Sequence, residues 1–164
     1  MGVLTSRNGQ QPRLERMLAE DFGPIDYRSN PISFTFTDYY TNEMGGGISR
    51  IFYSFEKLVQ PDTLADIKVR TNHLETFFAE PDGRKVNLDP GLLSLGKLIL
   101  ASTKDNAQRI PLSRGIFAEI TLIYTRKKYR PLPWTYRDYQ SDEYLQVLSE
   151  IRNIYKGQME KIER

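Results

Sequence analysis

The chain has 164 residues, the size of one domain, and its hydrophobic fraction of 39% and charged fraction of 27% are those of an ordinary globular protein. It has no cysteine and one histidine, His73, which excludes disulfides, thiolate metal sites, a cysteine nucleophile and any site that needs two imidazoles. A net charge of +2 excludes a general basic coat for nucleic acid but leaves room for a local basic patch.

The amino-acid sequence shows neither a membrane-spanning segment nor a secretion signal. There is no run of about 18 apolar residues, and the N-terminus lacks a basic stretch followed by an apolar core. We therefore expect no membrane span, no secretion and a cytoplasmic location. No linker, internal repeat or low-complexity segment divides the sequence, so residues 1–164 are expected to form a single domain.

The first half of the chain alternates strand and helix patterns. Residues 2–6 are β-like, residues 11–21 have apolar positions at helical spacing, and residues 25–36 and 48–55 alternate as half-buried strands around a polar turn over 37–47. The most regular helical pattern covers residues 63–79, and a short strand follows over 84–88. This β-α-β-β-α-β order predicts an α+β fold with a ferredoxin-like first half.

The second half is expected to be rich in β-structure. Strand patterns cover residues 97–103 and 116–124, and a basic triplet over 126–128 is expected at the tip of a hairpin that returns over 129–132. Ser141 is the expected cap of a final amphipathic helix. Antiparallel β hairpins and a C-terminal helix would thus complete the ferredoxin-like half.

Residues 91–97, GLLSLGK, match the G-x-x-x-x-G-K frame of a phosphate-binding loop. In such loops a Ser or Thr after the lysine holds magnesium, and a helix begins there. Here Leu98 follows Lys97, and the residues after it have a strand pattern. We therefore favour a glycine-containing turn that leads into a strand, and the sequence does not decide whether the frame binds phosphate.

Charged residues embedded in apolar segments supply the candidate site. Basic residues at strand ends beside apolar stretches are able to line a pocket for phosphate or carboxylate, although more often they form a solvated sheet edge. The candidate ligand-binding residues are Lys68, Arg84, Asp89, Lys97, Lys104, Asp105 and Arg109.

The candidate catalytic residues are three carboxylates, Glu43, Glu75 and Glu119. Glu119 stands out because a carboxylate inside an apolar strand is costly unless it is paired, metal-bound or turned to solvent. An ordinary exposed sheet face explains Glu119 equally well. If the carboxylates converged they would bind magnesium through oxygen, but no local spacing ties them together, so the sequence assigns no metal site.

The segment from residue 124 to 139 combines five cations, including Arg126 and Arg130, with five aromatic residues, including Trp134 and Tyr136. Cations interleaved with rings are suited to stacking on bases and pairing with phosphates. The alternative is a charged hairpin tip followed by rings that pack against the last helix. The sequence favours this alternative, because Pro131 and Pro133 make an anchoring role for Trp134 natural.

Several motifs together resemble an uncharacterised bacterial family that is catalogued only as a domain of unknown function. They are TDYY with EMG over 37–45, VNLDPG over 86–91, KLILASTKD over 97–105, GIFAEITL over 115–122 and WTYRDY over 134–139. The resemblance covers nearly the whole chain and implies bacterial origin and a cytoplasmic location. Some members carry the label "GTP-binding protein", and members are expected to have a histidine where this chain has Gln108.

The sequence leaves the function open between two classes, and it does not decide whether the chain is an enzyme. The leading hypothesis is a domain that binds, and in one version acts on, a phosphorylated ligand such as a nucleotide or RNA, with magnesium as the cofactor to consider. The alternative is a non-catalytic module that uses residues 124–139 on a protein partner. Convergence of the three carboxylates with the cations would favour the first hypothesis, and an exposed apolar patch around Trp134 would favour the second.

Overall fold

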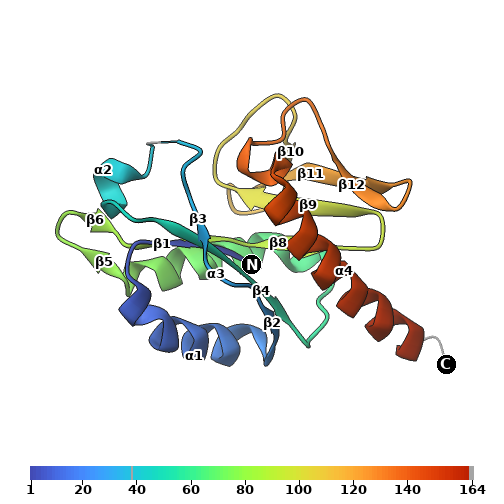
Figure 1. Cartoon of the computed structure of the whole chain (residues 1–164), viewed down its shortest axis with the longest axis horizontal. Coiled ribbons are helices and arrows are strands. Elements are labelled where there is room, and N and C mark those ends of the chain that lie inside the picture. The colour runs from blue at the N-terminus through green and yellow to red at the C-terminus, as the bar shows by residue number, and fades with distance from the viewer. Residues whose placement is uncertain (38, 163–164) are drawn as a thin grey trace. The chain divides into compact units, whose positions relative to one another are not determined.

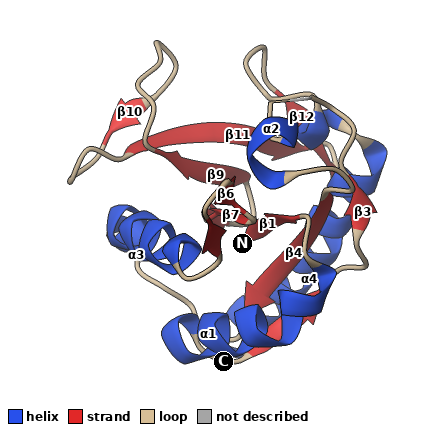
Figure 2. Cartoon of the chain, turned by 90° about the vertical axis from the view of Figure 1, so that its left-hand side faces the viewer, coloured by secondary structure: helices blue, strands red, loops and turns tan. Residues whose placement is uncertain are grey.

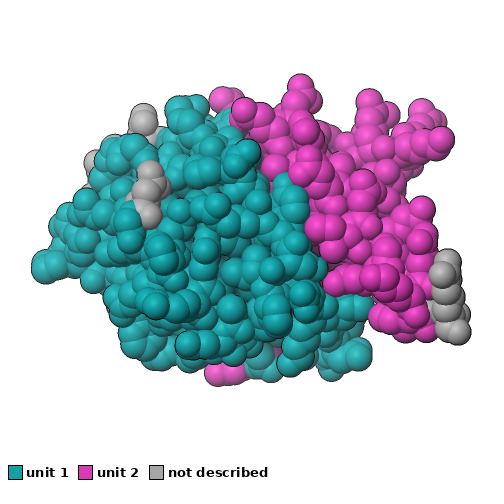
Figure 3. All heavy atoms as spheres, turned by 60° about the horizontal axis from the view of Figure 1, so that its bottom comes forward, with its two compact units in different colours: residues 1–90 teal, residues 91–164 magenta. Residues whose placement is uncertain are grey.

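The structure is a computed structural model that describes residues 1–37 and 39–162, and it divides into two compact units, residues 1–90 and residues 91–164 (Figure 3). Asp38, part of the first family-like motif, lies outside the described residues. The assignment of the whole chain to one domain stays a prediction. None of the described helices combines the length and the apolar character needed to cross a membrane.

The sheet of unit 1 has the connectivity expected for a ferredoxin-like half (Figure 1). Its strands pair antiparallel in the order β2-β4-β1-β7, with bounds Ile25–Arg28, Ser49–Phe55, Gly2–Thr5 and Val86–Asp89. Helix α1, Gln11–Phe22, joins β1 to β2, and helix α3, Leu64–Thr76, lies in the chain between β4 and β7. The α+β fold predicted from the β-α-β-β-α-β pattern is therefore confirmed.

Both long helices of unit 1 pack on the same face of this sheet (Figure 2). Side chains alternate along a strand, so Val3 points to one face of β1 and Leu4 to the other. Val3 belongs to the core that contains Leu14 of α1 and Leu74 of α3, whereas Leu4 packs with Phe34 in a second cluster. The first face holds the helices, and the second holds a smaller apolar cluster.

The chain departs from the expected elements where proline and glycine interrupt a pattern. The single strand expected over 25–36 is divided at Pro31, which has no N–H to donate to a ladder, and resumes as β3, Ile32–Ser33. The expected polar turn over 37–47 contains a short helix, α2, Thr41–Met44. The helix expected to reach residue 79 ends at Thr76, and Ala79–Glu80 and Gly83–Arg84 form the hairpin β5–β6 across Pro81 and Asp82.

Unit 2 is built around the long strand β11, Phe117–Thr125. Strand β9, Lys97–Ser102, pairs along one edge of β11 and with β8, Gly91–Leu93. Because β10, Ile110–Pro111, and β12, Lys128–Pro131, pair with β11 where β9 also pairs, they share its other edge. Helix α4, Asp142–Ile162, follows, and Ser141 caps it as expected, its Oγ accepting from the N–H of Tyr144. Short 3-10 turns lie at Asn8–Gln10, Pro61–Thr63 and Asp138–Gln140.

Helix α4 lies on one face of the unit 2 sheet, and the opposite face is open at the end near the β11–β12 turn. Tyr124 pairs with Tyr129 across β11 and β12, so both rings lie on the same face. Arg152 of α4 lies 3.6 Å from the ring centroid of Tyr124 on that face. Ile123, the neighbour of Tyr124 in β11, therefore points to the opposite, exposed face.

Candidate functional site

Arg84 of β6 connects the charged side chains of unit 1. Its Nε and Nη2 donate to the two carboxylate oxygens of Glu43 at 2.7 and 3.0 Å, and its Nη1 donates to Glu75 and to Asn87, both at 3.0 Å. A guanidinium holds its donors in a fixed plane, which makes such two-pronged bonds to carboxylates strong and directional. The hydrogen bonds that Arg84 donates to Glu43 and then to Glu75 raise the pKa of Arg84 above its ordinary value.

Lys68 and Glu75 of α3 bind the backbone of the same residue, Leu88, in the edge strand β7. The Lys68 ammonium donates to the Leu88 carbonyl at 2.8 Å, and the Leu88 N–H donates to Glu75 at 2.7 Å. An edge strand has outward peptide groups without a strand partner, and buried peptide groups need one. The two side chains, seven residues apart on the helix, take the place of the missing strand at Leu88.

Glu75 and Glu43 share Arg84 but have opposite pKa shifts. Burial of Glu75, which is 5% exposed, raises the pKa of its carboxyl, because the charges of Lys68 and Arg84 and the Leu88 N–H do not fully compensate the loss of water. The hydrogen bonds from Arg84 lower the pKa of Glu43, which is more exposed. The same cation thus stabilises one carboxylate at the surface and only partly compensates the burial of the other.

Asn87 extends the network from Arg84 to Asp89 and Arg50. The Asn87 amide donates to Asp89 at 2.9 Å, and Arg50, whose side chain is 3% exposed, donates to the other Asp89 oxygen at 2.7 Å. Arg50 and Asn87 both pair with Leu4 of β1, so they lie on the face without the helices. Burial by itself would raise the pKa of Asp89, but the charges of Arg50 and Lys68 outweigh it and lower that pKa.

The short helix α2 is fixed to the β5–β6 hairpin through Glu43. Lys85, which is almost fully buried, donates to the Glu43 carbonyl and to Asp82, both at 2.9 Å. Gly83 has a φ of +131°, and a Cβ there would lie 2.7 Å from Cγ of Glu43. Glycine is therefore required at this position both for its backbone conformation and for the close approach of Glu43. Lys85 was not singled out from the sequence, because nothing in its local pattern distinguishes it from an exposed lysine.

Unit 2 contains a buried ion pair between Arg109 and Glu119, whose side chains are 3% and 4% exposed. Arg109 Nε donates to Oε2 of Glu119 at 2.9 Å, and Gln108 donates to the same oxygen at 3.0 Å. The remaining Arg109 nitrogens donate to the Ser102 hydroxyl, the Lys104 carbonyl and the Tyr136 hydroxyl. Glu119 is therefore paired, one of the outcomes that its place in an apolar strand required.

The two networks hold most of the residues singled out from the sequence, but with internal partners. Glu43, Glu75, Lys68, Arg84 and Asp89 come together in unit 1, and Arg109 and Glu119 come together in unit 2. Arg84 and Arg109 each donate four hydrogen bonds, from all three nitrogens, so a ligand would compete with the protein partners of these cations. Across residues 1–37 and 39–162, no three or more His, Asp or Glu side chains gather as they would around a metal ion. The catalytic and ligand-binding roles of these residues stay predictions.

The G-x-x-x-x-G-K frame lies in the β8–β9 hairpin, as the strand pattern after Lys97 favoured. Gly91 pairs with Leu100, and a Cβ at Gly91 would lie 2.6 Å from the Ile99 carbonyl oxygen, so the glycine allows the two strands to approach. The Ser94 N–H donates to the Lys97 carbonyl at 2.9 Å and closes the turn. No helix begins at Lys97, whose side chain is exposed, as are those of Lys104 and Asp105.

The exposed face of the unit 2 sheet carries a row of cations whose proximity the sequence did not predict. Lys97 of β9 and Arg130 of β12 both pair with Ile123 of β11, so the three side chains lie side by side on the face away from α4. In the next row Lys128 pairs with Thr125. The alternation of Lys128, Tyr129 and Arg130 was the available signal, but Lys97, which shares the partner Ile123 with Arg130, lies 33 positions before Arg130 in the chain.

Trp134 and Tyr136 correct the packing favoured for the 124–139 segment. Tyr139 is buried and its ring packs edge-on against Tyr144 of α4, as that interpretation requires. Trp134 and Tyr136, in contrast, are 40% and 53% exposed. Trp134 Nε1 donates to the Ile120 carbonyl at 2.9 Å, so the residues after β12 continue along the edge of β11 rather than against the helix.

Comparison with known proteins assigns the chain to a family but to no activity. The family model described as "Domain of unknown function (DUF4416)" matches residues 1–155, and the chain therefore belongs to this family. The comparisons with curated proteins and with solved structures gave no match. The family membership confirms the resemblance drawn from the sequence motifs.

Replacement of Glu75 tests its role at the sheet edge. Glu75→Leu should lower the free energy of unfolding by about 2–4 kcal/mol, because the buried Leu88 N–H and one Arg84 donor lose their acceptor. Glu75→Gln should cost less than Glu75→Leu, since the amide oxygen still accepts from Leu88 and only the bond from Arg84 is lost. Urea denaturation of both variants at neutral pH measures the difference, and equal stabilities would contradict the role of Glu75 as acceptor.

Comparison of the wild-type chain with Glu75→Gln should also show that the contribution of Glu75 to stability depends on pH. The folded chain holds the Glu75 proton at higher pH than the unfolded chain, because the pKa of Glu75 is raised above its ordinary value of 4.5. Between these two pKa values stability therefore falls as pH rises. The stability of the wild-type chain relative to Glu75→Gln should increase as pH is lowered towards 4.5.

For Asp89 the dependence on pH should have the opposite sign, because the pKa of Asp89 is lowered. The stability of the wild-type chain relative to Asp89→Asn should decrease as pH is lowered below 3.8.

A double-mutant cycle separates a structural role of Arg109 and Glu119 from a role in binding. Arg109→Leu should destabilise the fold by about 3–5 kcal/mol, because it leaves the Glu119 carboxylate buried without its cation. Adding Glu119→Leu should recover about half of this loss, as apolar residues often replace a buried pair without further cost. Arg7→Leu, which breaks an exposed pair with Glu80, is the control and should change stability little. An Arg109→Leu protein of unchanged stability would return Arg109 to the candidate ligand-binding residues.

Proposed function

We propose that this DUF4416 protein binds, in the cytoplasm, a ligand that carries several phosphates, such as a nucleic acid, through the exposed basic surface of unit 2. This basic surface consists of Lys97, Lys128 and Arg130 on the open sheet face and Arg126 and Lys127 at the β11–β12 turn. The supporting observation is the charge of residues 91–137. Their exposed charged side chains are eight Lys or Arg and one carboxylate, Asp105. Such an excess attracts polyanions and raises their rate of association.

The cations of the basic surface differ from those in the two networks by having no carboxylate beside them. Among the residues that the structure describes, none of the five forms an ion pair, whereas Arg84 and Arg109 are paired with carboxylates. An exposed cation without a protein partner pays little desolvation and keeps all of its donors for phosphate oxygens. Of the residues singled out from the sequence, Lys97 keeps a ligand-binding role in this proposal. Lys68, Arg84 and Arg109 support the fold.

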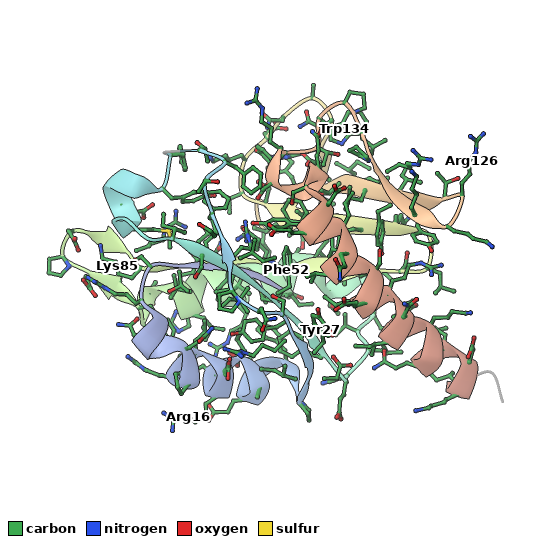
Figure 4. The ribbon with its side chains drawn as sticks, in the orientation of Figure 1. Arg16, Tyr27, Phe52, Lys85, Arg126 and Trp134 are labelled. Atoms are coloured by element: carbon green, nitrogen blue, oxygen red, sulfur yellow. The ribbon has the colours of Figure 1, made fainter. Side chains whose placement is uncertain are left out.

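The turn between β11 and β12 supports the proposal by an independent route. Arg126 and Lys127 have φ values of +50° and +63°, the left-handed conformation that a two-residue type I′ hairpin turn requires. Asn-Gly is the favoured sequence for this turn, and side chains such as Arg and Lys adopt it at a cost of about 1 kcal/mol or more each. Figure 4 shows Arg126 projecting beyond the end of the hairpin. Binding of phosphate by these two cations would explain why Arg and Lys occupy strained positions at the tip of the hairpin.

Unit 1 is a poor surface for the same ligand. Residues 1–90 contain ten Lys or Arg and thirteen Asp or Glu, so their net charge is negative. The carboxylates proposed from the sequence as catalytic, Glu43 and Glu75, are hydrogen-bonded to Arg84. Binding rather than catalysis is therefore the activity we propose.

A protein partner is the second candidate function, favoured by the apolar side chains exposed on unit 2. Ile110 is 61% exposed and Leu112 42% exposed, near the start of the segment that leads into β11. Exposed apolar side chains of this kind mark protein interaction sites when they are contiguous. The unpaired cations of the basic surface are better explained by a phosphate ligand, which is why we place this candidate second.

Replacement of the turn residues tests the proposal with two readouts of opposite sign. The variant Arg126→Asn/Lys127→Gly should raise the free energy of unfolding by about 1–2 kcal/mol, because it relieves the left-handed strain. It should also weaken binding of inorganic polyphosphate and of a fluorescein-labelled oligonucleotide. The slope of log K against log salt concentration for the oligonucleotide should fall by about 2, one unit for each lost cation. Fluorescence anisotropy at several salt concentrations measures both.

The matched control is Arg16→Gln/Lys57→Gln, which removes two exposed cations from unit 1 (Arg16 is labelled in Figure 4). It should leave polyanion binding unchanged. No binding of either polyanion by the wild-type chain at low salt would refute the proposed function. Equal weakening by the control would show that net charge, and not the basic surface, drives the association.

A further inference from the structure

The open face of the unit 2 sheet combines its cations with aliphatic side chains. Near the hairpin, the residues that strand pairing and alternation place on this face are Lys97, Ile99, Ile120, Ile123, Thr125, Lys128 and Arg130. None of these residues is aromatic. The two rings of the hairpin point to the opposite face, where Tyr129 is 2% exposed and Arg152 of α4 stacks on Tyr124. A ligand bound among these cations therefore meets no hairpin ring on which a base would stack.

The polar groups of this face are suited to phosphate oxygens rather than to base edges. Lys97, Lys128 and Arg130 only donate hydrogen bonds, and phosphate oxygens only accept them. Adenine and cytosine are read by amide and carboxylate side chains, and none of the residues that the pairing places beside these cations carries either group. Contacts to phosphate position a nucleic acid but carry no sequence information. The face is therefore suited to hold a backbone.

Two of the cations lie on either side of one exposed aliphatic residue. Lys97 and Arg130 pair with Ile123 from the two neighbouring strands, so their backbones are two strand spacings apart, about 10 Å. Ile123 between them is 38% exposed. The major groove of B-form DNA is about 12 Å wide. Two long cationic side chains at this separation are able to reach phosphates on both rims of one such groove, with Ile123 directed towards the groove between them.

The end of the hairpin extends beyond the neighbouring strand. The last pair between β9 and β11 is Lys97 with Ile123, whereas β11 and β12 remain paired as far as Thr125 and Lys128. Residues 125–128 thus form a two-stranded projection that carries Arg126 and Lys127 at its turn, and Arg126 is labelled in Figure 4. A two-stranded β-ribbon is an element that the major groove of B-form DNA admits. The major groove of A-form RNA is too deep and narrow for side chains to read.

We infer that the ligand of the basic surface is double-stranded DNA, which the β11–β12 hairpin contacts through phosphates on both rims of the major groove without reading the base sequence. This inference rests on the proposed function and specifies its ligand. A single strand is bound in large part through stacking of its bases, for which this face has no ring. Inorganic polyphosphate would need the cations but not their placement on two sides of Ile123.

Competition for a fluorescein-labelled DNA duplex tests the inference by fluorescence anisotropy with the full chain. The competitors are an unlabelled DNA duplex, one of its single strands, the RNA duplex of the same sequence and inorganic polyphosphate. We expect the DNA duplex to compete about tenfold more strongly than the single strand, which offers one row of phosphates instead of two. DNA duplexes of unrelated sequence should compete equally, because phosphate contacts carry no sequence information.

A carboxylate placed between the two flanking cations tests the geometry. Ile123→Glu should weaken binding of the DNA duplex about tenfold or more, because it opposes Lys97 and Arg130 at the centre of the contact. The matched control is Ile162→Glu, the same substitution at a residue of α4 that is 65% exposed, and it should leave binding unchanged. Both variants change the net charge equally, and thermal melting shows whether each is folded.

Single removal of either flanking cation tests the contact with both rims. Lys97→Gln and Arg130→Gln should each lower the slope of log K against log salt concentration by about one unit for the DNA duplex. Each should also reduce the preference for duplex over single strand, because contact with one rim is lost. An unchanged preference in both variants would contradict the placement of these cations on two rims.

The outcomes distinguish this inference from the proposed function. Equal competition by duplex, single strand and polyphosphate overturns the inference and leaves the basic surface as a general polyanion site. Stronger competition by the RNA duplex or by the single strand also overturns it. Failure of every polyanion to bind overturns both proposals. Preference for the DNA duplex, reduced by Ile123→Glu and not by Ile162→Glu, supports the inference.

Discussion

An ionised side chain is tolerated in the interior of this protein only where a partner of opposite charge or a peptide group replaces the water it has lost. Lys68 and Glu75 meet this requirement at Leu88, and in doing so they hold α3 to the open edge of the sheet. Arg84 meets it with Glu43 and Glu75 and so connects α2 and α3 to the hairpin β5–β6. The fixed partners of buried charges thus determine how the helices of unit 1 are attached to its sheet.

The same requirement divides the charged residues of the chain into two groups with different uses. Buried residues such as Arg109 donate from each of their nitrogens to protein partners, so their hydrogen bonds stabilise the fold. Exposed residues such as Arg126 and Arg130 form no ion pair with the part of the chain that the structure describes, which leaves their donors for phosphate in the function we propose. In this chain a charged residue within an apolar segment therefore indicates a structural ion pair rather than a ligand site. The candidates for ligand binding are instead the cations on the open sheet face.

The sequence predicted the order of the main elements because alternation and helical spacing are local properties of each segment. The β-α-β-β-α-β half, the hairpin around residues 126–128 and the helix capped by Ser141 all follow from such patterns. The errors lie where a single residue overrides a pattern, as Pro31 divides the expected strand over 25–36. Helix α2 was missed because four residues are too few to show a helical period.

For the candidate site, the sequence by itself determined the composition: the basic excess of residues 91–137, the absence of cysteine and the failure of the G-x-x-x-x-G-K frame to precede a helix pattern. The tertiary structure alone decided which charges are paired. Arg84 and Glu43 are 41 positions apart in the chain. Lys97 and Arg130 lie on the same sheet face because each pairs with Ile123. Sequence patterns carry the local period of a strand or helix, whereas ion pairing depends on distance in space, which is fixed only when the elements pack.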